Sequence, residues 1–206
     1  MNKGQTLAQT IRYCGILICL ALALTACQEE VIPTPTRPPP TAVIRHRDAA
    51  PFMLTLDDLG QGYQIVEQHR LEKGKGWNEE ATRLSGYRHV YQGTETPFTT
   101  VICQVECYLS VNETFSAYRA YKEELVSRLQ EQYASINESE THKVGDWAAV
   151  LSARNPDNEN ERAFYYLFTR ENILVEVTLI GPNMANFDGL SLQQAQVVDQ
   201  RITARE

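Results

Sequence analysis

Two cysteines, Cys103 and Cys107, are the side chains in this sequence best suited to redox or metal chemistry. They lie in the stretch TTVICQVECYLSV, residues 99–111, where every second residue from Val101 onward is apolar or cysteine. This alternation predicts a strand with one buried face, on which the two thiols would lie roughly 13 Å apart. Because a disulfide needs Cα atoms within about 7 Å, we expect two buried free thiols. A bridge across a bulge and a metal site are the alternatives.

Carboxylates and histidines are the other groups that could act chemically. Asp57 and Asp58 are adjacent and Asp146 follows a glycine, so turn and helix-capping roles are expected for all three. The histidines lack metal-ligand spacing such as HxH or HExxH; they are His46, His69, His89 and His142. No GxSxG, Walker or GxGxxG motif occurs. The sequence therefore predicts no catalytic residue, no metal ligand and no cofactor.

Tyrosines are the candidate binding residues. Four of them fall in predicted strands where they could face away from the core, and exposed tyrosines suit binding surfaces: Tyr87, Tyr91, Tyr108 and Tyr165. The alternative is that a helix covers this face of the sheet and the tyrosines form its floor.

The first 26 residues have the composition of a secretory signal. Lys3 and Arg12 make a positive start without acids, and the apolar run CGILICLALAL at residues 14–24 follows. This run is too short for a membrane-spanning helix, which needs about 20 apolar residues. Small residues and Cys27 come next.

The tetrapeptide Leu24-Thr25-Ala26-Cys27 resembles the lipobox of bacterial lipoproteins. The resemblance implies cleavage before Cys27, a diacylglyceryl group on its thiol, and a protein held on the extracytoplasmic face of a bacterial cell membrane. Two acyl chains are sufficient for stable anchoring. An ordinary cleaved signal and an uncleaved anchor are the alternatives.

A tether follows at residues 27–50. Its prolines lie among threonines, as in a polyproline II spacer of about 3.1 Å per residue: Pro33, Pro35, Pro38, Pro39 and Pro40. The basic stretch at residues 45–47 is expected to be a solvated end of this spacer. Residues 51–206 then form one domain, long enough to bury its own core.

The net charge argues against nucleic acid as a partner. The formal charge is −7, and removal of residues 1–26 deletes Lys3 and Arg12 but no acid, which gives −9. Clustered Lys and Arg are what a polyanion requires. The expected partners are the membrane, through the lipid, and an unknown protein or small ligand.

Hydrophobic periodicity predicts the elements of the domain. Strands are expected at 63–67, 87–92, 99–111 and 142–153, with a loop at 69–81. A helix begins near Asn112 or Thr114, and a second one begins at Ser191, where SLQQ resembles a capping box. The stretch AFYYLFTRENILVEVTLIG predicts a hairpin with its turn at Glu171-Asn172, which pairs Phe168 with Val175.

This order of elements predicts an α+β fold, an antiparallel sheet packed with about two helices. The order resembles that of small PsbP-like sandwich domains and of uncharacterised bacterial lipoprotein domains. The sequence favours a non-catalytic, lipid-anchored domain that binds a protein or small ligand. An envelope hydrolase that uses Asp57, Asp58 or Asp146 beside a histidine is one alternative, and a structural assembly factor is another.

Overall fold

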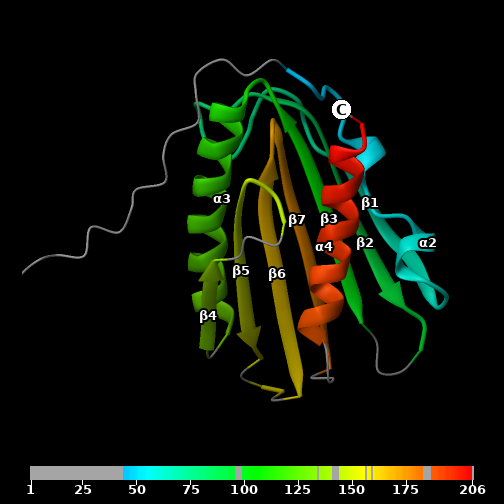
Figure 1. Cartoon of the computed structure of the whole chain (residues 1–206). Coiled ribbons are helices and arrows are strands. Elements are labelled where there is room, and N and C mark those ends of the chain that lie inside the picture. Colours follow the sequence, from blue (N-terminus) through cyan, green and yellow to red (C-terminus); the bar gives the residue numbers. More distant parts are fainter. Residues whose placement is uncertain are drawn as a thin grey trace, which may run out of the picture. The chain divides into compact units, whose positions relative to one another are not determined.

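A computed structural model describes residues 44–95, 99–133, 135–140, 144–155, 157–158, 160–182 and 187–205. Strands from both halves of the chain form one sheet, and helices pack on both of its faces (Figure 1). The predicted α+β class is confirmed. The predicted signal, lipobox and most of the tether lie outside the described residues.

The sheet has seven strands in the order β1-β2-β3-β7-β6-β5-β4, and every neighbouring pair is antiparallel. The strands are β1 (Tyr63–Arg70), β2 (Arg83–Gly93), β3 (Thr100–Tyr108), β4 (Ser135–Glu140), β5 (Trp147–Arg154), β6 (Glu161–Arg170) and β7 (Ile173–Pro182). Strand β4 was not predicted, because SINESE has no apolar alternation. It is an edge strand that pairs only with β5, so it has less need of such a pattern.

The β6–β7 hairpin confirms the register predicted from the sequence. Phe168 pairs with Val175, and Arg170 pairs with Ile173 across the turn. Glu171 takes the positive φ of 54° that this two-residue turn requires. The alternation of apolar and polar residues in the two strands was therefore sufficient to define which residues pair.

In the described residues, three α-helices and one 3-10 turn accompany the sheet: η1 (Ala50–Phe52), α2 (Leu56–Leu59), α3 (Val111–Gln132) and α4 (Phe187–Thr203). Helix α3 begins close to the predicted position, but its N-cap is Ser110 and not Asn112 or Thr114. Helix α4 begins four residues earlier than predicted. The expected capping box at Ser191 is wrong, because this side chain is buried inside the helix and donates to the Asp188 carbonyl.

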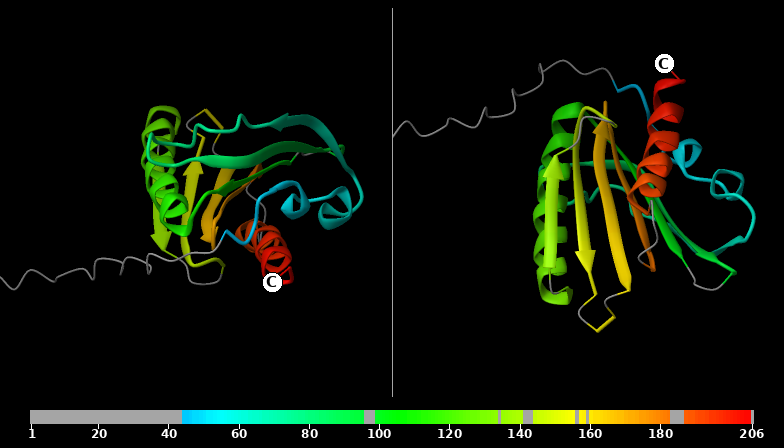
Figure 2. Two further views of the ribbon diagram at one scale, coloured as in Figure 1. Left: turned by 90° about the horizontal axis from the view of Figure 1, so that it is seen from above. Right: turned by 60° about the horizontal axis from the view of Figure 1, so that its bottom comes forward.

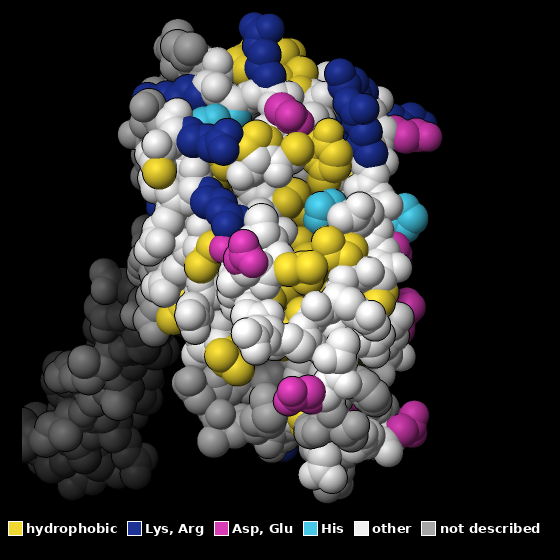
Figure 3. Space-filling view, turned by 90° about the vertical axis from the view of Figure 1, so that its right-hand side faces the viewer, with side chains coloured by type: hydrophobic (Ala, Val, Ile, Leu, Met, Phe, Trp, Pro, Cys, Tyr) yellow, Lys and Arg dark blue, Asp and Glu magenta, His cyan; other side chains and the backbone are white. Residues whose placement is uncertain are grey.

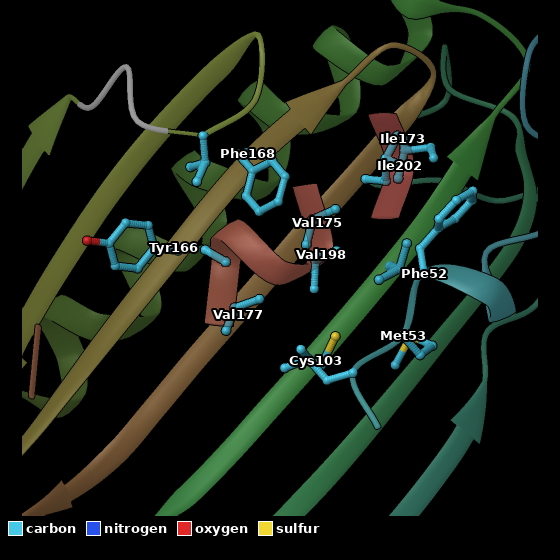
Figure 4. Close-up of a cluster of buried hydrophobic side chains, with 14 of the residues drawn as sticks. Phe52, Met53, Cys103, Tyr166, Phe168, Ile173, Val175, Val177, Val198 and Ile202 are labelled. Atoms are coloured by element: carbon cyan, nitrogen blue, oxygen red, sulfur yellow. The ribbon is translucent and has the colours of Figure 1, made fainter. Parts of the chain in front are cut away.

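Two hydrophobic cores lie on the two faces of the sheet, with α3 and α4 on opposite sides (Figure 2). Figure 4 shows the core under α4, where Val198 and Ile202 face the strand residues Val175 and Cys103 and the N-terminal Phe52. The other core packs α3 against the opposite face; its fully buried leucines are Leu125, Leu129, Leu151, Leu167 and Leu174. The compact unit Pro38–Glu206 contains both hydrophobic cores, which is the property of a domain that folds by itself.

The segment that precedes η1 is docked on the domain, which corrects the prediction of a solvated spacer end. The Asn172 side chain accepts from the His46 amide at 3.2 Å and donates to the His46 carbonyl at 2.7 Å. It also donates to the Tyr108 carbonyl at 2.8 Å. Arg45 forms an ion pair with Glu171 at 2.6 Å. The hairpin turn therefore holds the end of the tether by side chains that the sequence assigned only to the turn.

Candidate functional site

The four tyrosines do not form the exposed surface predicted for them. Tyr91 and Tyr108 are 0% exposed and Tyr165 is 7% exposed, while Tyr87 is partly buried. Tyr87 and Tyr91 belong to the core under α4, and Tyr108 and Tyr165 to the core under α3. The alternative of a covered sheet holds for three of them: Tyr108 and Tyr165 lie in the core packed on α3, and Tyr91 lies under the segment that carries Leu54, to whose carbonyl its hydroxyl donates.

Cys103 and Cys107 are buried free thiols, as predicted. Burial raises the pKa of each thiol to about 12, so both stay protonated at neutral pH. Within the described residues there is no group of three or more His, Cys, Asp or Glu side chains that could hold a metal ion. The two thiols are packing residues in the core under α4.

A groove of about 620 Å³ is the candidate binding site. We call it the η1 groove; its lining residues are Ala50, Pro51, Met53, Leu54, Thr55, Leu56, Asp57, Ile65, His89 and Arg201. The segment 50–57 supplies most of the lining, β1 and β2 contribute Ile65 and His89, and α4 contributes Arg201. Hydrophobic side chains gather in a strip on this side of the molecule, with a histidine among them (Figure 3). Apolar surface with a few polar groups is typical of small-molecule sites.

The side chain of Asp58 fixes one wall of the η1 groove. Its carboxylate accepts from the Thr55 amide at 2.6 Å and the Thr55 hydroxyl at 2.7 Å, which caps α2. It also forms two contacts of 2.5 and 2.7 Å with the Arg201 guanidinium of α4. Arg201 in turn donates to the Met53 carbonyl at 2.6 Å. Burial alone would raise the pKa of Asp58, but hydrogen bonds from Thr55 and Arg201 hold it below its ordinary value of 3.8.

His89 is the polar group contributed by the sheet. Its Nδ1 lies 3.1 Å from the Tyr91 hydroxyl, and that hydroxyl donates to the Leu54 carbonyl. This pair of contacts ties the segment that forms the groove wall to strand β2. Burial lowers the pKa of His89 below 6.5 and raises that of Tyr91, so both side chains are neutral at pH 7. The sequence treated His89 only as a strand or surface residue.

The acids named for a hydrolase do not place two free carboxylates beside His89. Asp146 is bound to Arg170 at 2.7 Å and accepts from the Glu171 amide, in the turn that was predicted for it. Asp58 has the capping role that was predicted, and Asp57 is the only one of the three acids that lines the groove. Two of these carboxylates beside a histidine would have favoured hydrolysis, and the η1 groove supplies one.

A second polar cluster, missed by the sequence analysis, is buried under α3. Glu106 is 1% exposed and accepts from Trp77 at 2.8 Å, Gln104 at 2.6 Å and Tyr108 at 2.8 Å. It also pairs with the Arg83 guanidinium. Its polar partners are all within the domain, so it is a structural network and offers no free group to a ligand.

The loop that contains Trp77 closes this cluster. The indole stacks on the Tyr121 ring of α3 with centroids 3.9 Å apart, so Trp77 folds back on the domain. The Tyr121 hydroxyl donates to Glu176, which is 5% exposed and also accepts from Thr178 at 2.6 Å. In the sequence, Glu106 and Glu176 could have been recognised as buried polar residues, because each is an acid at a position of a predicted strand that faces the protein interior.

Comparisons with known proteins show a fold relationship. No protein-family model matches the sequence, and no curated protein matches it significantly. The fold is similar to that of the extracellular domain of PknH from Mycobacterium tuberculosis, with a TM-score of 0.52 and 10% identity. The similarity covers 79% of this chain and 98% of the PknH domain. None of the helices in the described ranges is long and apolar enough to cross a membrane.

Proposed function

We propose that this chain is a lipid-anchored extracytoplasmic protein whose domain binds a small, largely apolar ligand in the η1 groove. The observation that carries the proposal is the groove itself, which is lined mostly by apolar side chains, together with Thr55, the acid Asp57, a neutral histidine and a guanidinium that is already paired. Two apolar side chains of the groove region remain partly exposed, Leu56 at 39% and Ile65 at 38%. A ligand would remove this apolar surface from water.

Support for the location comes from the lipobox-like LTAC at residues 24–27 and the proline-rich spacer after it. The PknH domain of similar fold is extracellular, which is consistent with the same side of a membrane for this chain. The anchor is tested by intact mass and membrane fractionation of the native protein beside a Cys27→Ser variant. A diacylglyceryl mass on a chain that begins at Cys27, absent from the variant, is expected. An unmodified chain that begins elsewhere would refute the anchor.

The binding function is tested with Nile red, an uncharged dye whose fluorescence rises in apolar surroundings. The chain Pro38–Glu206 should bind the dye, and Ile65→Arg should weaken binding at least tenfold because it places a guanidinium in the groove. Val66→Arg is the matched control: Val66 is the next residue, is 50% exposed and does not line the groove. Equal loss in both variants, or no binding by the native domain, would refute the η1 groove as a ligand site.

A further inference from the structure

The tautomer of His89 follows from its contacts. The Tyr91 hydroxyl lies within hydrogen-bond distance of the Leu54 carbonyl and of His89 Nδ1. A carbonyl can only accept, so the single hydroxyl proton is directed to Leu54 and the hydroxyl oxygen must accept from Nδ1–H. Because burial keeps the imidazole neutral at pH 7.5, its other nitrogen, Nε2, carries a lone pair.

That lone pair is available to a ligand. No described residue forms a hydrogen bond with Nε2 of His89, and the side chain lines the η1 groove. A ligand that covers this nitrogen without supplying a donor would leave a buried acceptor unpaired, which is unfavourable, so the groove favours a ligand that brings a donor. The polar end of the ligand is thereby defined as a donor.

The charged residues of the lining disfavour an anion inside the groove. The Arg201 guanidinium is compensated by the Asp58 carboxylate, with both carboxylate oxygens in contact. Asp57, also in the lining, adds a negative charge that no described cation pairs. A carboxylate or phosphate ligand would therefore meet a neutral acceptor and an acid instead of a free cation.

We infer that the η1 groove is specific for an uncharged amphiphile, an aliphatic chain ending in a hydroxyl group that donates to Nε2 of His89. This inference rests on the proposed function of the groove and adds the class of ligand. Leu56, Ile65 and Met53 contact the aliphatic part, and His89 selects the polar end. The same groove discriminates against a fatty acid of equal length at neutral pH.

The test compares three probes on the chain Pro38–Glu206 at pH 7.5: 1-octanol, methyl heptyl ether and octanoate. The ether has the same number of heavy atoms as the alcohol but no donor. Binding is followed by NMR shifts of the Leu56 and Ile65 amides. The alcohol should bind about tenfold more tightly than the ether, the value of one neutral hydrogen bond, and octanoate should bind more weakly than the alcohol.

His89→Phe should abolish the preference for the alcohol while both neutral probes still bind. His69→Phe is the matched control, because His69 is an exposed histidine of β1 outside the groove, and it should keep the preference. Equal affinity of the native domain for alcohol and ether, or tighter binding of octanoate, would overturn the inference and leave the groove as a binding site. No groove shifts with either neutral probe would overturn both the inference and the proposed function.

Discussion

Asp58→Asn tests whether one carboxylate holds the wall of the η1 groove. The aspartate caps α2 through the Thr55 amide and binds Arg201 through both oxygens. Asparagine keeps one oxygen that can accept from Thr55, but loss of the negative charge in the first turn of α2 costs about 1 kcal/mol. Loss of the charge-assisted bonds to Arg201 costs about 1 kcal/mol more, since the guanidinium is 28% exposed and solvent screens part of the interaction. We expect the variant to lower the free energy of unfolding by about 2 kcal/mol.

Urea denaturation of the chain Pro38–Glu206 measures this loss, and amide hydrogen exchange locates it. Protection should fall in residues 53–60, on the groove wall, and stay unchanged in β6 and β7. Asp57→Asn is the control, because it makes the same change one residue earlier at an exposed side chain without the contacts to Thr55 and Arg201. Equal destabilisation by the two variants would refute the reasoning.

The pH dependence gives a second check on Asp58. Its pKa is lowered in the folded state, so its contribution to stability is complete above the unfolded value of 3.8 and is lost as the pH falls through the folded pKa. The difference in unfolding free energy between the native chain and Asp58→Asn should therefore be constant from pH 5 to pH 7 and shrink below pH 3.8. A difference that grows on acidification would show that the carboxylate is not stabilised by these contacts.

Three further predictions concern the rest of the domain. Glu106→Gln should lower the free energy of unfolding by about 3 kcal/mol in urea titrations, because it breaks a buried pair with Arg83. Glu138→Gln is the control: it breaks an exposed pair with Lys122 and should change this free energy by less than about 1 kcal/mol. Similar losses in the two variants would contradict the role of Glu106. Asn172→Ala should lower the free energy of unfolding by about 3 kcal/mol and expose the His46 amide to hydrogen exchange, since three hydrogen bonds are lost. Asn158→Ala, in an exposed turn, is the control and should have little effect. Continued protection of the His46 amide in Asn172→Ala would argue against the docked tether end. Cys103 and Cys107 should resist Ellman's reagent at pH 8 in the native domain and react fully in urea, given buried thiols with a pKa of about 12; fast reaction without urea would contradict their burial.

Local patterning was enough for much of the fold. The alternation in residues 99–111 predicted β3 and its buried cysteines, and complementary patterns in β6 and β7 predicted their register, because a shift of one residue would move every apolar side chain to the other face. Strands β1 and β2 were predicted but extend further than expected, to Arg70 and from Arg83. The additional residues of β1 are mostly exposed, so they show no clear hydrophobic period.

The candidate site was less accessible to prediction than the fold. The four tyrosines were placed in strands, but whether each face of the sheet is covered depends on distant segments of the chain, such as those that form α3 and α4. His89 was not recognised as a groove residue for the same reason. The periodicity of its strand indicates which face of the sheet it lies on, but the groove around it is formed by residues 50–57 and by Arg201, which are distant in sequence. No local pattern connects these segments.

By itself, the sequence determined the fold class, the register of the central hairpin and the burial of both thiols, because these depend on periodicity within short segments. It also predicts a lipid anchor and a tether, which remain to be tested. Only the tertiary structure decided that the tyrosines are buried and that a groove lies beside His89. The ion pair between Asp58 and Arg201, 143 residues apart, illustrates the reason: the groove wall is held by contacts that exist only after α4 has packed beside α2.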